Sequence, residues 1–124
     1  MAAPNIVNVT SIIGKTASVT PSNTTDNVLI ANPASSNKVL KINIVMCANI
    51  DGNAAYAATV SINSNASGTG TSVPLLSTVT VPANATVIAV DKSTSIYLEE
   101  DRSIVVKSGV SSKISYTVSY EEIS

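Results

Sequence analysis

Histidine, tryptophan and phenylalanine are absent from this 124-residue sequence, and cysteine occurs only once. Without histidine the commonest general base is missing, which excludes nucleophile systems of the Ser-His and Cys-His kinds. One cysteine without histidine also cannot supply the ligands of a tetrahedral zinc centre, so a metal ion would have to be bound through oxygen. We therefore predict a protein that is not an enzyme and that holds no cofactor.

Charge is scarce as well, since seven basic and eight acidic side chains give a net charge of −1. A chain of this kind has no field that would attract nucleic acid or an anionic membrane. The four tyrosines do not lie in basic stripes of the type that bind single strands. No long apolar stretch follows the uncharged residues 1–5, so neither a signal peptide nor a transmembrane helix is indicated. We expect a cytoplasmic chain without nucleic acid or membrane partners.

The residues that are abundant favour β-structure. Apolar residues make up 44% of the sequence, mainly Val, Ile, Ala and Leu, and Ser, Thr and Asn fill most of the remainder. β-Branched side chains fit a pleated surface, whereas Ser, Thr and Asn compete for the hydrogen bonds of a helix. The lone Cys47 lies in the apolar run 42–50 and is expected to be a small buried hydrophobe. Helices should be absent or short.

Short apolar or alternating segments, separated by turn residues, predict about eight to ten strands in one domain covering residues 1–124. The run 38–50 is the expected central strand. Residues 5–13 and 16–20, which Gly14 and Lys15 separate, are expected to form either a first strand or a hairpin with its turn at the glycine. This spacing indicates an all-β, two-sheet β-sandwich, either Ig-like or jelly-roll-like, with a barrel as an alternative. The expected strands are 5–13, 16–20, 26–31, 38–50, 56–62, 73–81, 86–90, 95–99, 103–107 and 113–121.

The densest group of carboxylates is Glu99-Glu100-Asp101, which lies beside Arg102. We interpret it as a solvated turn or a surface ion pair, with Ca²⁺ or Mg²⁺ binding and paired-carboxylate glycoside hydrolysis as the alternatives. Asp51-Gly52-Asn53 is sufficiently explained as a tight turn.

Two regions are candidate interaction surfaces. Residues 63–72 form a polar, Gly-rich tract that predicts an exposed, mobile loop, in which Asn65, Gly68 and Gly70 are candidate contact residues. The last strand carries the second set of candidates, which consists of Tyr116, Tyr120, Glu121 and Glu122. The two tyrosines share one strand face, so they belong either to the core or to a subunit interface, and core packing is the favoured reading.

Several segments, namely 28–33, 38–42, 48–52 and 95–123, together resemble small virion proteins of tailed bacteriophages, particularly phages of marine cyanobacteria. The resemblance implies a structural role in the virus particle and offers no catalytic motif. It also implies a homo-oligomer, for instance a trimer, made in the cytoplasm of a host bacterium and assembled into the virion with the major capsid protein or other virion proteins.

Three functions follow from this resemblance. The first is a capsid decoration or cement protein that bridges neighbouring subunits of the shell. The second is a tail, neck or fibre-associated module that contributes to host attachment. The third, a polysaccharide-cleaving tail enzyme, is disfavoured because His, Trp and Phe are missing.

Overall fold

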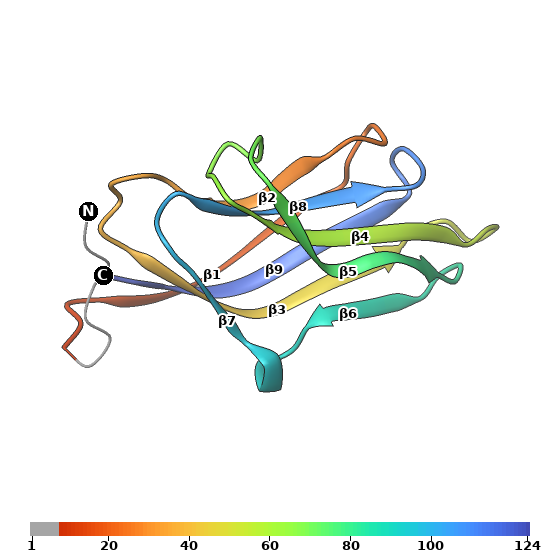
Figure 1. The fold of residues 1–124 in the computed structure, drawn as a ribbon. Coiled ribbons are helices and arrows are strands. Elements are labelled where there is room, and N and C mark those ends of the chain that lie inside the picture. Colours follow the sequence, from red (N-terminus) through yellow and green to blue (C-terminus); the bar gives the residue numbers. More distant parts are fainter. Residues whose placement is uncertain (1–7) are drawn as a thin grey trace.

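A computed structural model of the protein describes residues 8–124, and its regular secondary structure is almost entirely β-strand (Figure 1). No helix within this range is long and apolar enough to cross a membrane. The described elements are β1 (Ile12–Val19), β2 (Asn27–Asn32), β3 (Val39–Asn49), β4 (Tyr56–Asn63), β5 (Ser72–Val81), β6 (Thr86–Val90), the 3₁₀ turn η1 (Lys92–Thr94), β7 (Ile96–Leu98), β8 (Arg102–Ser108) and β9 (Ile114–Ile123).

The strands form two antiparallel sheets, so the predicted two-sheet sandwich is confirmed. Sheet A has the order β1-β9-β3-β6, with β7 also paired to β3, and sheet B has the order β2-β8-β4-β5. The strands pair in order from the two ends of the chain inward: β1 with β9, β2 with β8, β3 with β6 and β7, and β4 with β5. This connectivity is that of a jelly roll, which decides between the two kinds of sandwich that the sequence left open.

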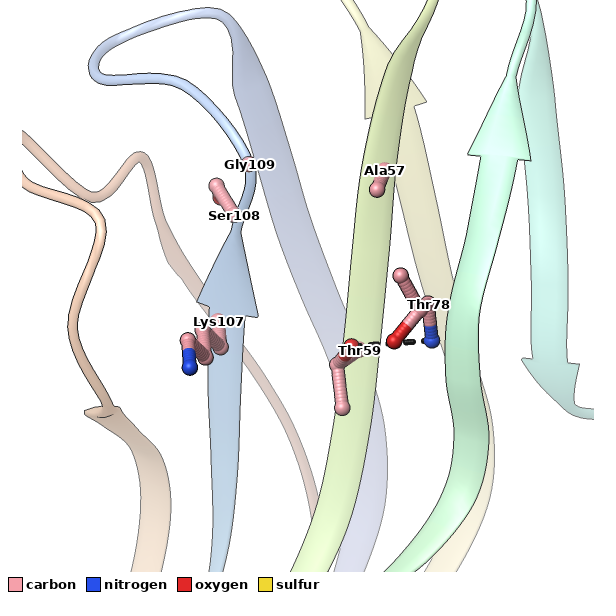
Figure 2. A pocket seen from close by; sticks show the side chains of 6 residues that line it. All are labelled: Ala57, Thr59, Thr78, Lys107, Ser108 and Gly109. Atoms are coloured by element: carbon pink, nitrogen blue, oxygen red, sulfur yellow. Dashed lines mark hydrogen bonds between the residues drawn. The ribbon is translucent and has the colours of Figure 1, made fainter.

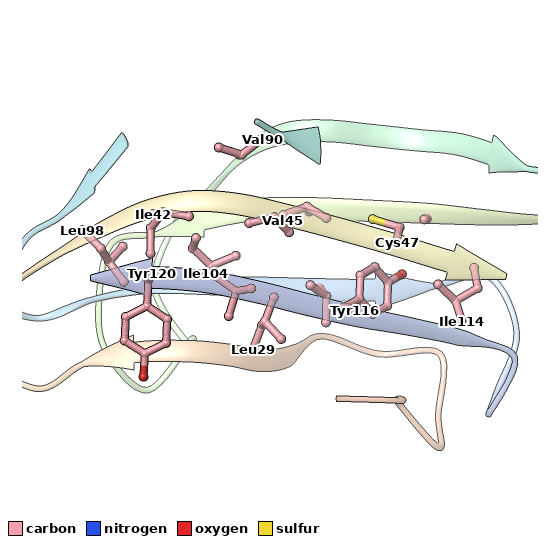
Figure 3. Packing of buried hydrophobic residues seen from close by; sticks show 14 of the residues in the cluster. Leu29, Ile42, Val45, Cys47, Val90, Leu98, Ile104, Ile114, Tyr116 and Tyr120 are labelled. Atoms are coloured by element: carbon pink, nitrogen blue, oxygen red, sulfur yellow. The ribbon is translucent and has the colours of Figure 1, made fainter. Parts of the chain in front are cut away.

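The core lies between the sheets and is built by alternation along the strands (Figure 3). On β9 the inward residues Ile114, Tyr116, Val118 and Tyr120 are all buried. On β3 a bulge between Ile42 and Ile44 shifts the alternation by one residue, as bulges do. Cys47 therefore points inward, where burial raises the pKa of its thiol to about 12.

Of the two alternatives for the first segment, the structure shows a strand and not a hairpin with a turn at Gly14. β1 runs without a break through Gly14 and Lys15, because each of its eight residues pairs with β9 in one register. Gly14 also lies outside the left-handed region that a tight turn would require. The predicted strand residues 5–7 lie outside the described part of the chain.

Candidate interaction surface

Tyr116 belongs to the core, as the favoured reading of the last strand predicts. Its ring is fully buried, and burial raises the pKa of its phenol to about 12. The hydroxyl donates to the backbone oxygen of Lys107 at 2.9 Å and lies 3.0 Å from the hydroxyl of Ser108. Because the polar tip is satisfied inside the chain, the side chain has no free surface for a partner.

Tyr120 is the last buried residue on the inward face of β9, and it lines a cavity at the edge of the core. Its side chain is 8% exposed. The cavity has a volume of about 480 Å³ and opens between β2 of sheet B and the β3 and β9 strands of sheet A. Its wall combines apolar residues, such as Pro33 and Leu40, with the polar groups of Lys38, Tyr120 and Glu122. The wall thus places two charged groups and a phenol hydroxyl beside apolar surface.

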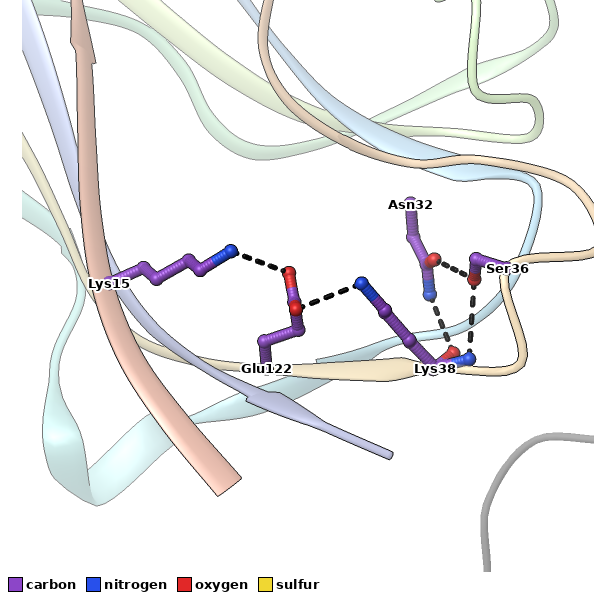
Figure 4. A network of polar contacts seen from close by, with 5 residues as sticks. All are labelled: Lys15, Asn32, Ser36, Lys38 and Glu122. Atoms are coloured by element: carbon purple, nitrogen blue, oxygen red, sulfur yellow. Dashed lines mark hydrogen bonds and ion pairs between the residues drawn. The ribbon is translucent and has the colours of Figure 1, made fainter. Parts of the chain in front are cut away.

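Glu122 is held by two lysines beside this cavity (Figure 4). The Lys38 ammonium donates to its Oε1 at 2.9 Å, and the Lys15 ammonium donates to its Oε2 at 3.1 Å. The hydrogen bond from Lys38, followed by that from Lys15, lowers the pKa of the Glu122 carboxyl. Both lysines are more than 40% exposed and the carboxylate is 16% exposed, so water screens the ion pairs and their role is mainly to fix side-chain direction.

Glu121 alternates with Glu122 along β9 and therefore lies on the opposite, outer face of sheet A. Its Oε2 accepts a hydrogen bond from the Asn43 side chain at 3.3 Å, and Lys41 is its partner in the β3–β9 register. The two neighbouring glutamates predicted as one surface group thus occupy two different faces of the molecule.

The loop between β4 and β5 is exposed at residues 64, 67 and 69–72, as predicted, and it is also anchored to sheet B. Asn65 is only partly exposed, and its backbone oxygen accepts a hydrogen bond from Ser103 on β8 at 2.7 Å. Gly68 lies against sheet B so closely that an added Cβ would be 2.8 Å from Val28 and 3.0 Å from Val105. The loop therefore packs on part of the outer face of sheet B, and of the three predicted contact residues only Gly70 is exposed.

A second hollow, of about 250 Å³, lies on the outer face of sheet B (Figure 2). It is lined by residues of β4, β5 and the end of β8, including Thr59, Thr78 and Lys107. Thr78 has φ of 49°, which is strained for a β-branched residue, and its N–H donates to the Thr59 hydroxyl at 2.9 Å. Its lining carries one charged group, that of Lys107, and three hydroxyl groups.

The carboxylate group at the end of β7 forms a turn. Asp101 has φ of 55° and accepts a hydrogen bond from the backbone of Ala66 at 3.1 Å. Arg102 donates to the backbone oxygens of Ser64 and Asp101 and is not among the ion pairs of residues 8–124. Within the same range no group of three or more acidic, His or Cys side chains is arranged to hold a metal ion.

Sequence reasoning missed three buried asparagines that end successive strands, namely Asn32 on β2, Asn49 on β3 and Asn63 on β4. Each donates its side-chain N–H groups to backbone oxygens and accepts through its side-chain oxygen, so each ties the following loop to the sandwich. The signal was present, because in each case an asparagine is the last residue of a strand and a turn follows it.

No protein-family model matches the sequence, and no curated protein matches it either. These comparisons assign the chain to no family. The fold and the cavity lined by Tyr120 are known from the structure alone.

Proposed function

We propose that this protein is a structural component of a tailed-bacteriophage virion and decorates the outside of the capsid shell. The observation that carries the proposal is the strand order, because the jelly roll is an architecture on which viral capsid domains are built. The resemblance of 95–123 and three shorter segments to small virion proteins supports the same proposal.

The properties of the chain suit a cement protein. The sandwich is small and nearly neutral, and buried asparagines bind its loops to the ends of three strands. It can therefore act as a rigid module. A cement protein binds a shell through many copies, and repeated weak contacts then add up to a strong attachment. On this proposal the partners are the major capsid protein and further copies of the chain itself.

The copy number per particle tests the proposal. Quantitative mass spectrometry of purified virions should find hundreds of copies, in a fixed ratio to the major capsid protein. A handful of copies that co-purify with detached tails would overturn capsid decoration and support a tail, neck or fibre-associated module.

The cavity beside Tyr120 favours a second candidate function, which is host attachment through a surface glycan. Apolar walls and a few polar groups suit the faces and hydroxyls of a sugar ring. If so, purified protein should compete with phage adsorption, and Tyr120→Phe should weaken this competition while leaving the fold intact. An absence of competition by the unmodified protein would count against attachment.

A further inference from the structure

The four edges of the two sheets differ in how well they are protected against pairing with another strand. On β2 the register is broken by a bulge between Val28 and Ile30. On β5 the register shifts twice, and Pro74 lacks a backbone N–H. The edge formed by β6 and β7 is interrupted by η1. Bulges, prolines and interruptions of this kind are the usual means by which proteins block edge-to-edge association.

β1 carries none of these protections along its eight residues. Within residues 8–124 it pairs only with β9, so its other side is open. Ile12 and Ile13 are 55% and 48% exposed at the start of the strand. An unbroken edge with exposed apolar side chains is a template for a further strand.

The backbone groups on the open side can be assigned from the end of the β1–β9 ladder. Ser11 and Ser124 donate to each other's backbone oxygens, each at 2.9 Å, so they form a hydrogen-bonded pair. Such pairs alternate with non-hydrogen-bonded pairs in an antiparallel ladder. The residues that direct N–H and C=O groups away from β9 are therefore Ile12, Gly14, Thr16 and Ser18.

Lys15 lies in the middle of β1, and a lysine on an edge strand ordinarily opposes pairing with another strand. Its ammonium instead lies 3.1 Å from Glu122 on the neighbouring strand β9. Figure 4 shows the side chain extended toward Glu122 and Lys38. The ion pair thus draws the lysine over the sheet and leaves the open backbone groups of β1 uncovered.

We propose that β1 pairs in an antiparallel manner with β1 of a second copy, about a twofold axis that passes between the two Gly14 residues. In this register Ile12 faces Thr16 of the second copy, and Ile13 faces Lys15 of the second copy. β-Branched residues such as Ile12 and Thr16 form favourable cross-strand pairs. No like charges face each other.

The neighbouring register centred on Lys15 places two lysines directly opposite each other and is disfavoured. The strand is therefore complementary to itself about Gly14, where an added Cβ would meet no atom within 4 Å. A single ladder buries less surface than a stable dimer needs. We expect weak association of the purified protein, at high micromolar to millimolar concentration, which repetition on a symmetric surface would strengthen.

A charge-swap series measured by sedimentation equilibrium tests this pairing. Ile12→Lys combined with Thr16→Lys places like charges opposite each other twice and should weaken dimerisation by roughly tenfold. Ile12→Lys combined with Thr16→Asp places opposite charges there and should restore association by about the same factor, with the restored part lost at high salt. Both positions are exposed, so the fold is expected to survive.

Val73→Lys is the matched control, because Val73 is a 63% exposed residue on the protected β5 edge. This variant should dimerise like the unmodified protein. The proposal is overturned if the unmodified protein stays monomeric at millimolar concentration, if the two charge variants associate equally, or if Val73→Lys weakens association as much as the paired lysines. It concerns the purified chain, so its outcome does not depend on where the protein lies in a particle.

Discussion

Replacing Asn49 by alanine tests whether the buried asparagines hold the sandwich together. The side chain of Asn49 is 2% exposed and sits where β3 ends. It donates to the backbone oxygens of Ala54 and Val81 at 2.9 and 3.0 Å, and it accepts from the N–H of Asp51 at 2.9 Å. Alanine leaves all three groups without this partner.

The magnitude follows from where those groups lie. The bonds to Val81 and Asp51 are buried, whereas the bond to Ala54 is only partly buried. A buried group left unpaired costs about 1–3 kcal/mol, so Asn49→Ala should lower the free energy of unfolding by about 3–4 kcal/mol. For a domain of this size that corresponds to a fall in Tm of about 12–16 °C.

Urea denaturation followed by circular dichroism measures this loss, and Asn23→Ala supplies the control. Asn23 also takes part in three hydrogen bonds through its side-chain oxygen, but all of them are exposed. Because water can replace an exposed partner, we expect this control to lose only about 0.5 kcal/mol. Equal losses in the two variants would refute the argument that burial makes the strand-end asparagines important.

Three further predictions concern single sites. The lowered pKa of Glu122 stabilises the fold at neutral pH, and this contribution should be lost as the pH falls through that pKa; Glu122→Gln should therefore flatten the acid limb of stability against pH. Gly68→Ala, at φ of 78° and against Val28, should cost about 1–3 kcal/mol in denaturant unfolding, whereas Gly14→Ala should be nearly neutral. Similar costs would contradict the loop packing. Cys47 should resist a thiol reagent until denaturant is added, and rapid labelling of native protein would disprove its burial.

The sequence predicted the architecture well because strands with one buried face leave a local pattern. The central strand predicted at 38–50 is β3 at Val39–Asn49, and the predicted turn at Asp51-Gly52-Asn53 follows it. The order of strands in the sheets was not predictable, since the jelly roll depends on pairings such as β1 with β9 across almost the whole chain. The alternation of buried and exposed residues along a strand is the same whichever strand lies alongside it, so the pattern does not identify the partner.

The candidate sites were harder to predict, since they depend on long-range contacts. The loop after Asn63 is as polar as a free loop, and only Val28 and Val105 beneath Gly68 show that it is packed. Gly14 suggested a turn because glycine is common in turns, whereas here the continuous pairing with β9 decides the backbone. Tyr116 and Tyr120 share one face as expected, and the structure buries both.

Electron cryo-microscopy of the purified virion tests the central claim most directly. The account predicts that the nine-strand sandwich fits density on the outer surface of the capsid, in copies related by the symmetry of the shell. The absence of such density, together with the absence of the protein from the purified particle, would contradict a structural role in the virion.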